Sequence, residues 1–101
     1  MNFNYKELDE AAELLKVLAH PIRLCIVKGL IENGPQNVSC MQTCLEVPQS
    51  TVSQHLQKLK AAGIITGERN GLEIIYTVSS EVAIRTVKAL LKNFQLIGGV
   101  K

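Results

Sequence analysis

Apolar residues recur at helical spacing in five stretches of the chain, with polar and charged residues between them. In the first stretch Leu8, Leu15 and Leu18 fall on one side, and acidic residues and lysines occupy the other. The helices that this spacing predicts cover about residues 5–18, 21–31, 38–45, 49–62 and 80–97. Each has one apolar face, so the pattern predicts a mainly α-helical domain around one core.

The third and fourth helices are separated only by the stretch EVPQS. Pro48 prevents the earlier helix from continuing, because a proline disfavours the helical conformation of the residue before it. The side chain of Gln49 or Ser50 is expected to cap the later helix, which Gly63 ends. Two short helices joined by so tight a turn predict a helix-turn-helix over about residues 38–62.

The period then changes in the stretch IITGERNGLEIIYTV, which is rich in β-branched residues and tyrosine. Asn70 and Gly71 lie at its middle, and both tolerate the positive φ of a type I′ turn. We expect a β-hairpin over about residues 64–78. The predicted fold class is therefore mainly α with a β-hairpin wing, a single winged helix-turn-helix domain over residues 1–101.

The two end helices, about 5–18 and 80–97, are more apolar than a small monomer needs. The apolar positions of the last helix are Ile84, Val87, Leu90, Leu91, Phe94 and Ile97. A chain of 101 residues offers limited core, so these helices are best buried against each other or against a second copy. Of the two, we expect a homodimer.

The hydropathy of the chain and its net charge narrow the class of protein. No stretch approaches the roughly 18 uninterrupted apolar residues of a membrane span, and the N-terminus lacks a basic start followed by an apolar run. This predicts a cytoplasmic protein without membrane partners. The net charge is only +2, so affinity for DNA must come from where the charges lie.

The helix at 49–62 has the composition of one that reads DNA. Its apolar residues form one narrow side, and the rest is rich in Ser, Thr and Gln, without an acid. Such side chains donate to and accept from base edges, while Lys neutralises phosphate. The N-terminal residues of a recognition helix contact bases. The candidates there are Gln49, Ser50, Thr51, Ser53 and Gln54, followed by Gln57 and Lys58, with Arg69 and Asn70 at the hairpin tip.

His55 lies at the margin of the apolar side, where a phosphate contact or a structural hydrogen bond fits better than base reading. Arg23 falls inside the apolar arc of the second helix, so we expect a paired, partly buried guanidinium. A Ser/Gln-rich face also suits a solvated surface or a protein-interaction module. The hairpin that follows favours DNA, because its tip can reach an adjacent minor groove or phosphate.

Three segments together resemble the ArsR/SmtB family of winged-helix repressors, and most closely its PagR-like members. They are LLKVLAHPIRLCIVKGL, VPQSTVSQHLQKLKAAGII and GERNGLEIIYTV, in this order. The resemblance covers nearly the whole chain. It implies a homodimer built from the first and last helices, binding to a pseudo-palindromic operator in double-stranded DNA, and release by an inducer, which it does not identify.

Family members that sense metals carry paired cysteines in the helix before the recognition helix, where this chain has Asn37 and Ser39. Their second site takes ligands from the last helix, which here offers only Glu81. A persulfide-sensing branch pairs a cysteine of the second helix with one of the last helix. This chain has Cys25 at a different turn of the second helix and no cysteine in the last. The resemblance thus implies neither a metal nor a cofactor.

Three cysteines remain as candidate sensor thiols: Cys40 and Cys44, four positions apart on the third helix, and Cys25. The first two fall away from the apolar side and should be exposed. A disulfide between them requires helix distortion, since Cβ atoms about 6 Å apart must approach to about 3.8 Å. Inert thiols, a redox or electrophile response, and a soft metal or metalloid site all stay open. No nucleophile–base pair or phosphate loop occurs, so no enzyme is predicted.

Overall fold

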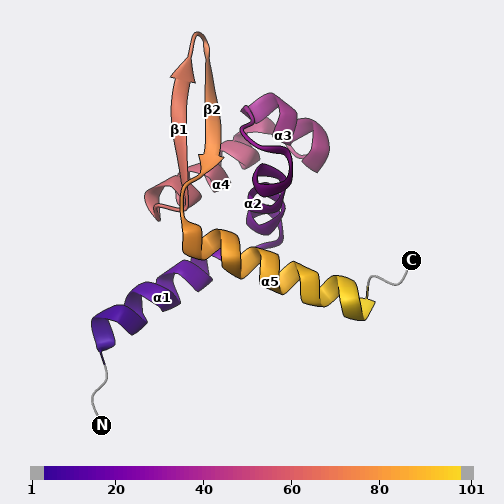
Figure 1. The fold of residues 1–101 in the computed structure, drawn as a ribbon. Helices are drawn as coiled ribbons and strands as arrows, with labels where there is room; N and C mark the ends of the chain where they lie inside the picture. Colours follow the sequence, from indigo (N-terminus) through magenta and orange to yellow (C-terminus); the bar gives the residue numbers. More distant parts are fainter. Residues whose placement is uncertain (1–3, 99–101) are drawn as a thin grey trace.

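The computed structural model of the protein describes residues 4–98, with side chains described for residues 4–91. Five helices and one hairpin follow the predicted order (Figure 1). The elements are α1 (Tyr5–Leu18), α2 (Pro21–Asn33), α3 (Val38–Leu45), α4 (Gln49–Ala61), β1 (Ile65–Asn70), β2 (Glu73–Val78) and α5 (Glu81–Gly98). The winged helix-turn-helix fold class is confirmed. Within the described residues, no helix is both long and apolar enough to cross a membrane.

The core lies between α2, α4, the base of the hairpin and the first turns of α5. Three residues of α2 and three of α4 are buried in it, as their helical spacing predicted. The buried apolar residues are Leu18, Ile26, Val27, Leu30, Met41, Val52, Leu56, Leu59, Ile64, Ile65, Tyr76, Ala83 and Val87. These contacts fix α4 in one rotational setting about its own axis.

The turn between α3 and α4 differs in detail from the prediction. Glu46 ends α3 in the left-handed conformation, with φ of 57°. Pro48 is the N-cap of α4, and its carbonyl oxygen accepts from the amides of Thr51 and Val52. No side chain of the described residues caps α4, so the expected cap by Gln49 or Ser50 is wrong. Gln49 and Ser50 lie within the first turn of the helix, and the N-cap residue Pro48 has no side-chain acceptor.

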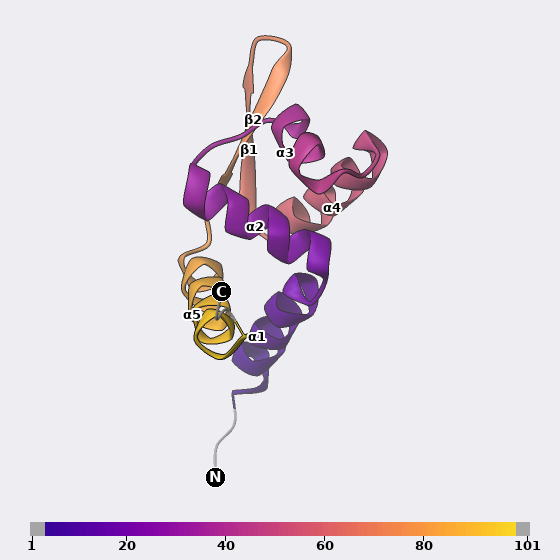
Figure 2. The same ribbon diagram turned by 90° about the vertical axis from the view of Figure 1, so that its right-hand side faces the viewer.

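The hairpin, called the wing below, stands away from the helices (Figures 1 and 2). Asn70 pairs with Glu73, so the turn residues are Gly71 and Leu72 instead of the predicted Asn70 and Gly71. Of the turn residues, all of which the structure describes, only Gly71 has a positive φ, 70°. A positive φ at the first central position is the type II′ pattern, not type I′. The turn is thus one residue later than predicted.

The wing is fixed by close packing between its own strands and by one bridge to the helices. At Gly67 a Cβ atom would lie 2.9 Å from Cγ2 of Ile74 and 3.0 Å from Cε1 of Tyr76, so only glycine admits this packing. Gln36, in the α2–α3 connection, pairs with Tyr76 through N–H to O=C bonds of 2.8 and 3.1 Å. This bridge adds a short third strand position beside β2 and joins the wing to the helix-turn-helix.

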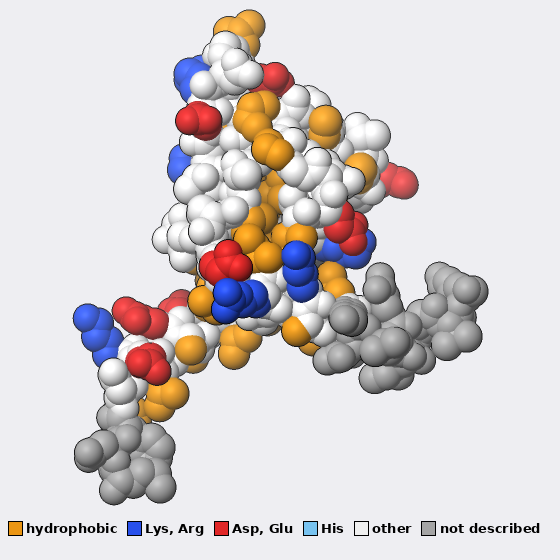
Figure 3. Space-filling view, in the orientation of Figure 1, with side chains coloured by type: hydrophobic (Ala, Val, Ile, Leu, Met, Phe, Trp, Pro, Cys, Tyr) orange, Lys and Arg blue, Asp and Glu red, His pale blue; other side chains and the backbone are white. Residues whose placement is uncertain are grey.

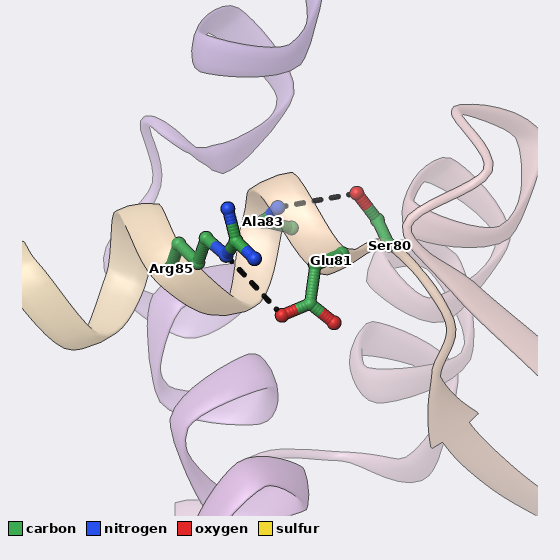
Figure 4. A network of polar contacts seen from close by, with 4 residues as sticks. All are labelled: Ser80, Glu81, Ala83 and Arg85. Atoms are coloured by element: carbon green, nitrogen blue, oxygen red, sulfur yellow. Dashed lines mark hydrogen bonds and ion pairs between the residues drawn. The ribbon is translucent and has the colours of Figure 1, made fainter.

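The end helices α1 and α5 extend to opposite sides of the molecule (Figure 1). Ser80 starts α5: its hydroxyl oxygen accepts from the Ala83 amide at 3.1 Å, and Arg85 pairs with Glu81 at 3.3 Å (Figure 4). This ion pair is well exposed and adds little stability. Ala83 and Val87 face the core, whereas Leu90 is exposed. The predicted apolar positions Phe94 and Ile97 lie outside the residues whose side chains are described.

Candidate nucleic-acid interface

The outer side of α4 consists of the polar residues that the sequence singled out. Val52, Leu56 and Leu59 are buried beneath the helix, so most of the other positions turn outward. The exposed candidates are Gln49, Ser50, Gln54, Gln57 and Lys58, and the half-buried ones are Thr51, Ser53 and His55. Lys58 and Lys60 lie in the last turn, and the helix contains no acid. This surface offers hydrogen-bonding groups at its start and positive charge at its end.

A groove of about 420 Å³ separates this surface from the wing. Gln49, Ser53 and Gln57 form its wall on α4, one below another at four-residue spacing. The opposite wall is the wing, and the start of α3 forms the floor. The residues from these two elements are Leu72, Glu73, Ile74, Tyr76, Asn37, Val38 and Ser39. The groove is therefore lined by the same helix-turn-helix and hairpin that were predicted to act together.

Asn37 links the start of α3 to the wing. Its side-chain oxygen accepts from the Cys40 amide at 2.9 Å, which caps α3, and its side-chain nitrogen donates to Oε1 of Glu73 at 2.6 Å. We call the second contact the Asn37–Glu73 clamp. In the sequence, Asn37 stood out only because it replaces a cysteine ligand of the family's metal-sensing members. The partner is 36 positions away, so no local signal indicated this contact.

His55 faces inward at the junction of α2 and α4. Its Nδ1 accepts from Nε of Arg23 at 3.1 Å, and Nη1 of Arg23 donates to the Val17 carbonyl oxygen at 3.1 Å. The His20 and His55 rings lie 4.4 Å apart. Burial, followed by the charges of His20 and Arg23, lowers the pKa of His55 below its usual 6.5. Of the two alternatives given for His55, a phosphate contact or a structural hydrogen bond, the structure shows the hydrogen bond, and Arg23 is paired as expected.

The charges of the wing are mixed. Arg69 and Asn70 are exposed near the tip, and Nη1 of Arg69 donates to the Gly71 carbonyl oxygen at 3.4 Å. Glu68 and Glu73 are exposed as well. The strands thus carry two acids against one base, which limits ionic attraction between the wing and a phosphate backbone.

All three thiols are exposed. Cys25 and Cys44 line one hollow of about 180 Å³ between α2 and α3, together with Ile26, Met41 and Leu45. Cys40 is outside the residues that line it. Among the described residues, no group of three or more His, Cys, Asp or Glu side chains is placed to hold a metal ion. The structure therefore associates Cys44 with Cys25, a relation that the sequence left open.

Comparison with known proteins agrees with this architecture. The model of a helix-turn-helix domain family matches residues 18–68. Over 72 residues, 71% of its length, the chain is 50% identical to the transcriptional repressor SmtB of Mycobacterium tuberculosis, of which it spans 53%, about half. It is 42% identical over 86 residues to the transcriptional repressor PagR of Bacillus anthracis, covering 85% of this chain and 86% of that protein.

Solved structures give the same result. The crystal structure of PagR superposes with a TM-score of 0.79 at 41% identity, over 86% of this chain and 99% of that one. A homodimeric winged helix-turn-helix DNA-binding domain from Mycobacterium bovis superposes with a TM-score of 0.78 at 27% identity, over 94% and 91%. In sequence and in fold, the chain belongs to the ArsR/SmtB family of winged helix-turn-helix transcriptional repressors.

Proposed function

We propose that the protein is a homodimeric transcriptional repressor that binds a pseudo-palindromic operator in double-stranded DNA. The observation that carries this proposal is the outer side of α4, which is acid-free, rich in Ser and Gln, and fixed in orientation by Val52, Leu56 and Leu59. The named activities of the SmtB and PagR relatives support it.

In this proposal the start of α4 enters the major groove. Gln49, Ser50 and Gln54 are exposed there, and glutamine can pair with adenine through two hydrogen bonds. The Ser50 side chain is available because it does not cap α4. Lys58 and Arg69 contact phosphate. Thr51, Ser53, Gln57 and Asn70 complete the DNA-facing surface, while His55 acts through its bond to Arg23.

Dimerisation follows from apolar side chains that one copy leaves uncovered. Leu8 and Leu15 of α1 are 49% and 56% exposed, and Val82 and Leu90 of α5 are 61% and 38% exposed. The two helices extend to opposite sides of one chain (Figure 1) and do not cover these positions. A second copy related by a two-fold axis would bury both sets and present two copies of α4 to DNA.

The test is a gel shift with the DNA upstream of the protein's own gene, against a scrambled fragment, at moderate salt. Sequence-selective binding by a dimer is expected, and its affinity should fall steeply with salt because phosphate contacts release counterions. Equal binding to both fragments, or none, would refute the repressor proposal. It would favour the Ser/Gln surface as a site for a partner protein.

We further propose that modification of a thiol releases the DNA, because Cys25 and Cys44 share the hollow between α2 and α3. A group added to either sulfur takes up that space and pushes α3, which braces α4, away from α2. DNA release by peroxide, polysulfide and arsenite is measured for wild type and for Cys25→Ser, Cys40→Ser and Cys44→Ser. Each of Cys25→Ser and Cys44→Ser should keep part of the response, the variant with both substitutions should lose it, and Cys40→Ser should respond like wild type. If wild type itself never responds, the thiols are inert.

A further inference from the structure

The apex of the wing is an apolar side chain. Because the turn is formed by Gly71 and Leu72, the leucine occupies the outermost position of the hairpin. Its side chain is fully exposed, at 103%, the largest exposure among the large apolar residues of the described part of the chain. Figure 3 shows a hydrophobic side chain at the top of the hairpin, above its charged groups. Among the described residues of one copy, none covers Leu72.

Leu72 lies toward the recognition helix α4. It lines the groove whose other wall is formed by Gln49, Ser53 and Gln57 of α4. The wing apex and the base-reading surface therefore border one concave space. A DNA strand lying in this groove would separate α4, in the major groove, from Leu72, at the adjacent minor groove.

The wing is firmly held below its apex. Tyr76 is 7% exposed and bonded to Gln36, and Gly67 lets Ile74 and Tyr76 pack across the strands. At the turn, Arg69 donates to the Gly71 carbonyl oxygen. Ionic contact is weak here, since Glu68 and Glu73 outnumber Arg69. A hairpin that reaches DNA with little positive charge and an apolar apex fits an apolar contact.

We propose that Leu72 is an apolar wedge that enters the minor groove beside each half-site and partly unstacks a base step. The proposal rests on operator binding through α4. Leucine is among the side chains that proteins use in this way, and the kink lets the duplex wrap more of the protein surface. Pyrimidine–purine steps such as TA deform most easily. Leu72 would thus add specificity at positions that no polar side chain reads.

The variants for the test are Leu72→Ala and Leu72→Ser, with Leu72→Met as the matched control that keeps an apolar wedge. Because the side chain is fully exposed, none of them should alter folding, which circular dichroism and thermal unfolding check. The DNA is the fragment bound in the gel shift, with 2-aminopurine placed at the steps flanking each half-site. Fluorescence of this base rises when it unstacks.

With wild type and Leu72→Met, we expect the flanking fluorescence to rise on binding. With Leu72→Ala and Leu72→Ser, it should stay at the level of free DNA, and affinity should fall about tenfold, which is about 1.4 kcal/mol. Gln54→Ala should weaken binding. Once enough of this variant is added to saturate the DNA, the rise in 2-aminopurine fluorescence should be kept.

Three results overturn the wedge. If wild type binds the fragment and Leu72→Ala shows the same affinity and fluorescence, the wedge alone is refuted and the repressor proposal stands. If wild type fails to bind any fragment selectively, both proposals are refuted. A stronger effect on a stiff A-tract flank without TA steps than on a flank with a flexible TA step would also contradict the mechanism, because the wedge should favour the deformable step.

Discussion

The recognition helix α4 and the wing border the same groove but are held in different ways. Three apolar residues of α4 are at most 1% exposed, so the core fixes this helix from below. The wing is a two-stranded sheet joined to the helices near Tyr76, and both of its strands end in exposed residues toward the tip. The recognition helix contributes buried side chains to the core, whereas the wing tip contributes only exposed ones.

This difference separates stability from recognition along the chain. Changes beneath α4 should unfold the protein and abolish DNA binding together. Changes at the wing tip should alter binding alone, because a tip without buried side chains contributes little to folding. The two leucines Leu56 and Leu72, one buried and one exposed, give the most direct contrast.

The largest effect is expected for Leu56→Ala. The side chain is 1% exposed, and its loss leaves a cavity that should lower the free energy of unfolding by about 2–5 kcal/mol. The same substitution at Leu72 should change it by less than about 0.5 kcal/mol. Urea unfolding followed by far-UV circular dichroism measures both. Equal losses would mean that the wing tip is part of the core in solution.

A smaller effect, on binding alone, is expected for Gln54→Ala and Lys58→Ala. Loss of Gln54 should cost about 1–3 kcal/mol at one symmetric base position and relax the preference there. Loss of Lys58 should weaken binding to all DNA sequences alike. It should also lower the slope of log affinity against log salt by about 1 per subunit. A binding panel with single-base variants at several salt concentrations checks both. The reverse pattern would refute the placement of α4 in the major groove.

The Asn37–Glu73 clamp tests how the wing depends on the helix-turn-helix. Asn37→Asp keeps an oxygen to accept from the Cys40 amide but puts a carboxylate against Glu73. We expect weaker operator binding by about 1 kcal/mol, with α3 intact.

Adding Glu73→Gln to the Asn37→Asp variant restores a donor at this contact. Operator affinity should then rise by more than Glu73→Gln alone changes the affinity of wild type. A double-mutant cycle on operator affinity measures this coupling. Additive effects would show that the clamp does not orient the wing.

The smallest effect is a pH dependence of stability that His55 confers. The lowered pKa means that the folded protein binds this proton less tightly than the unfolded chain, so acid favours unfolding. This contribution is absent above the usual pKa of 6.5 and grows as pH falls below it. In thermal unfolding from pH 8 to pH 5, Tm should fall less with decreasing pH for His55→Gln than for wild type. If Tm depended on pH in the same way in the variant and in wild type, the lowered pKa of an inward-facing His55 would be contradicted.

The sequence predicted α4 well because local spacing determines its buried side. Val52, Leu56 and Leu59 recur every three or four residues, so only one face of the helix can bury all three together. The wing turn was misplaced by one residue for an equally local reason. Asn70 and Gly71 both tolerate positive φ, so pattern alone could not decide which pair of residues forms the turn.

Contacts between distant parts of the chain were beyond local pattern. The Gln36–Tyr76 bridge, the Asn37–Glu73 clamp and the hollow shared by Cys25 and Cys44 join residues that only the packed fold brings together. The paired Arg23 could be predicted because a guanidinium inside an apolar arc needs a partner, although the sequence did not identify that partner as His55.

If two copies of α4 read DNA across a two-fold axis, selection from a pool of random duplexes will reveal it. We expect an enriched motif with two symmetric half-sites whose centres are separated by about 10–10.5 base pairs, or a multiple of this. Enrichment of a single unsymmetric site, or no enrichment over the starting pool, would contradict it.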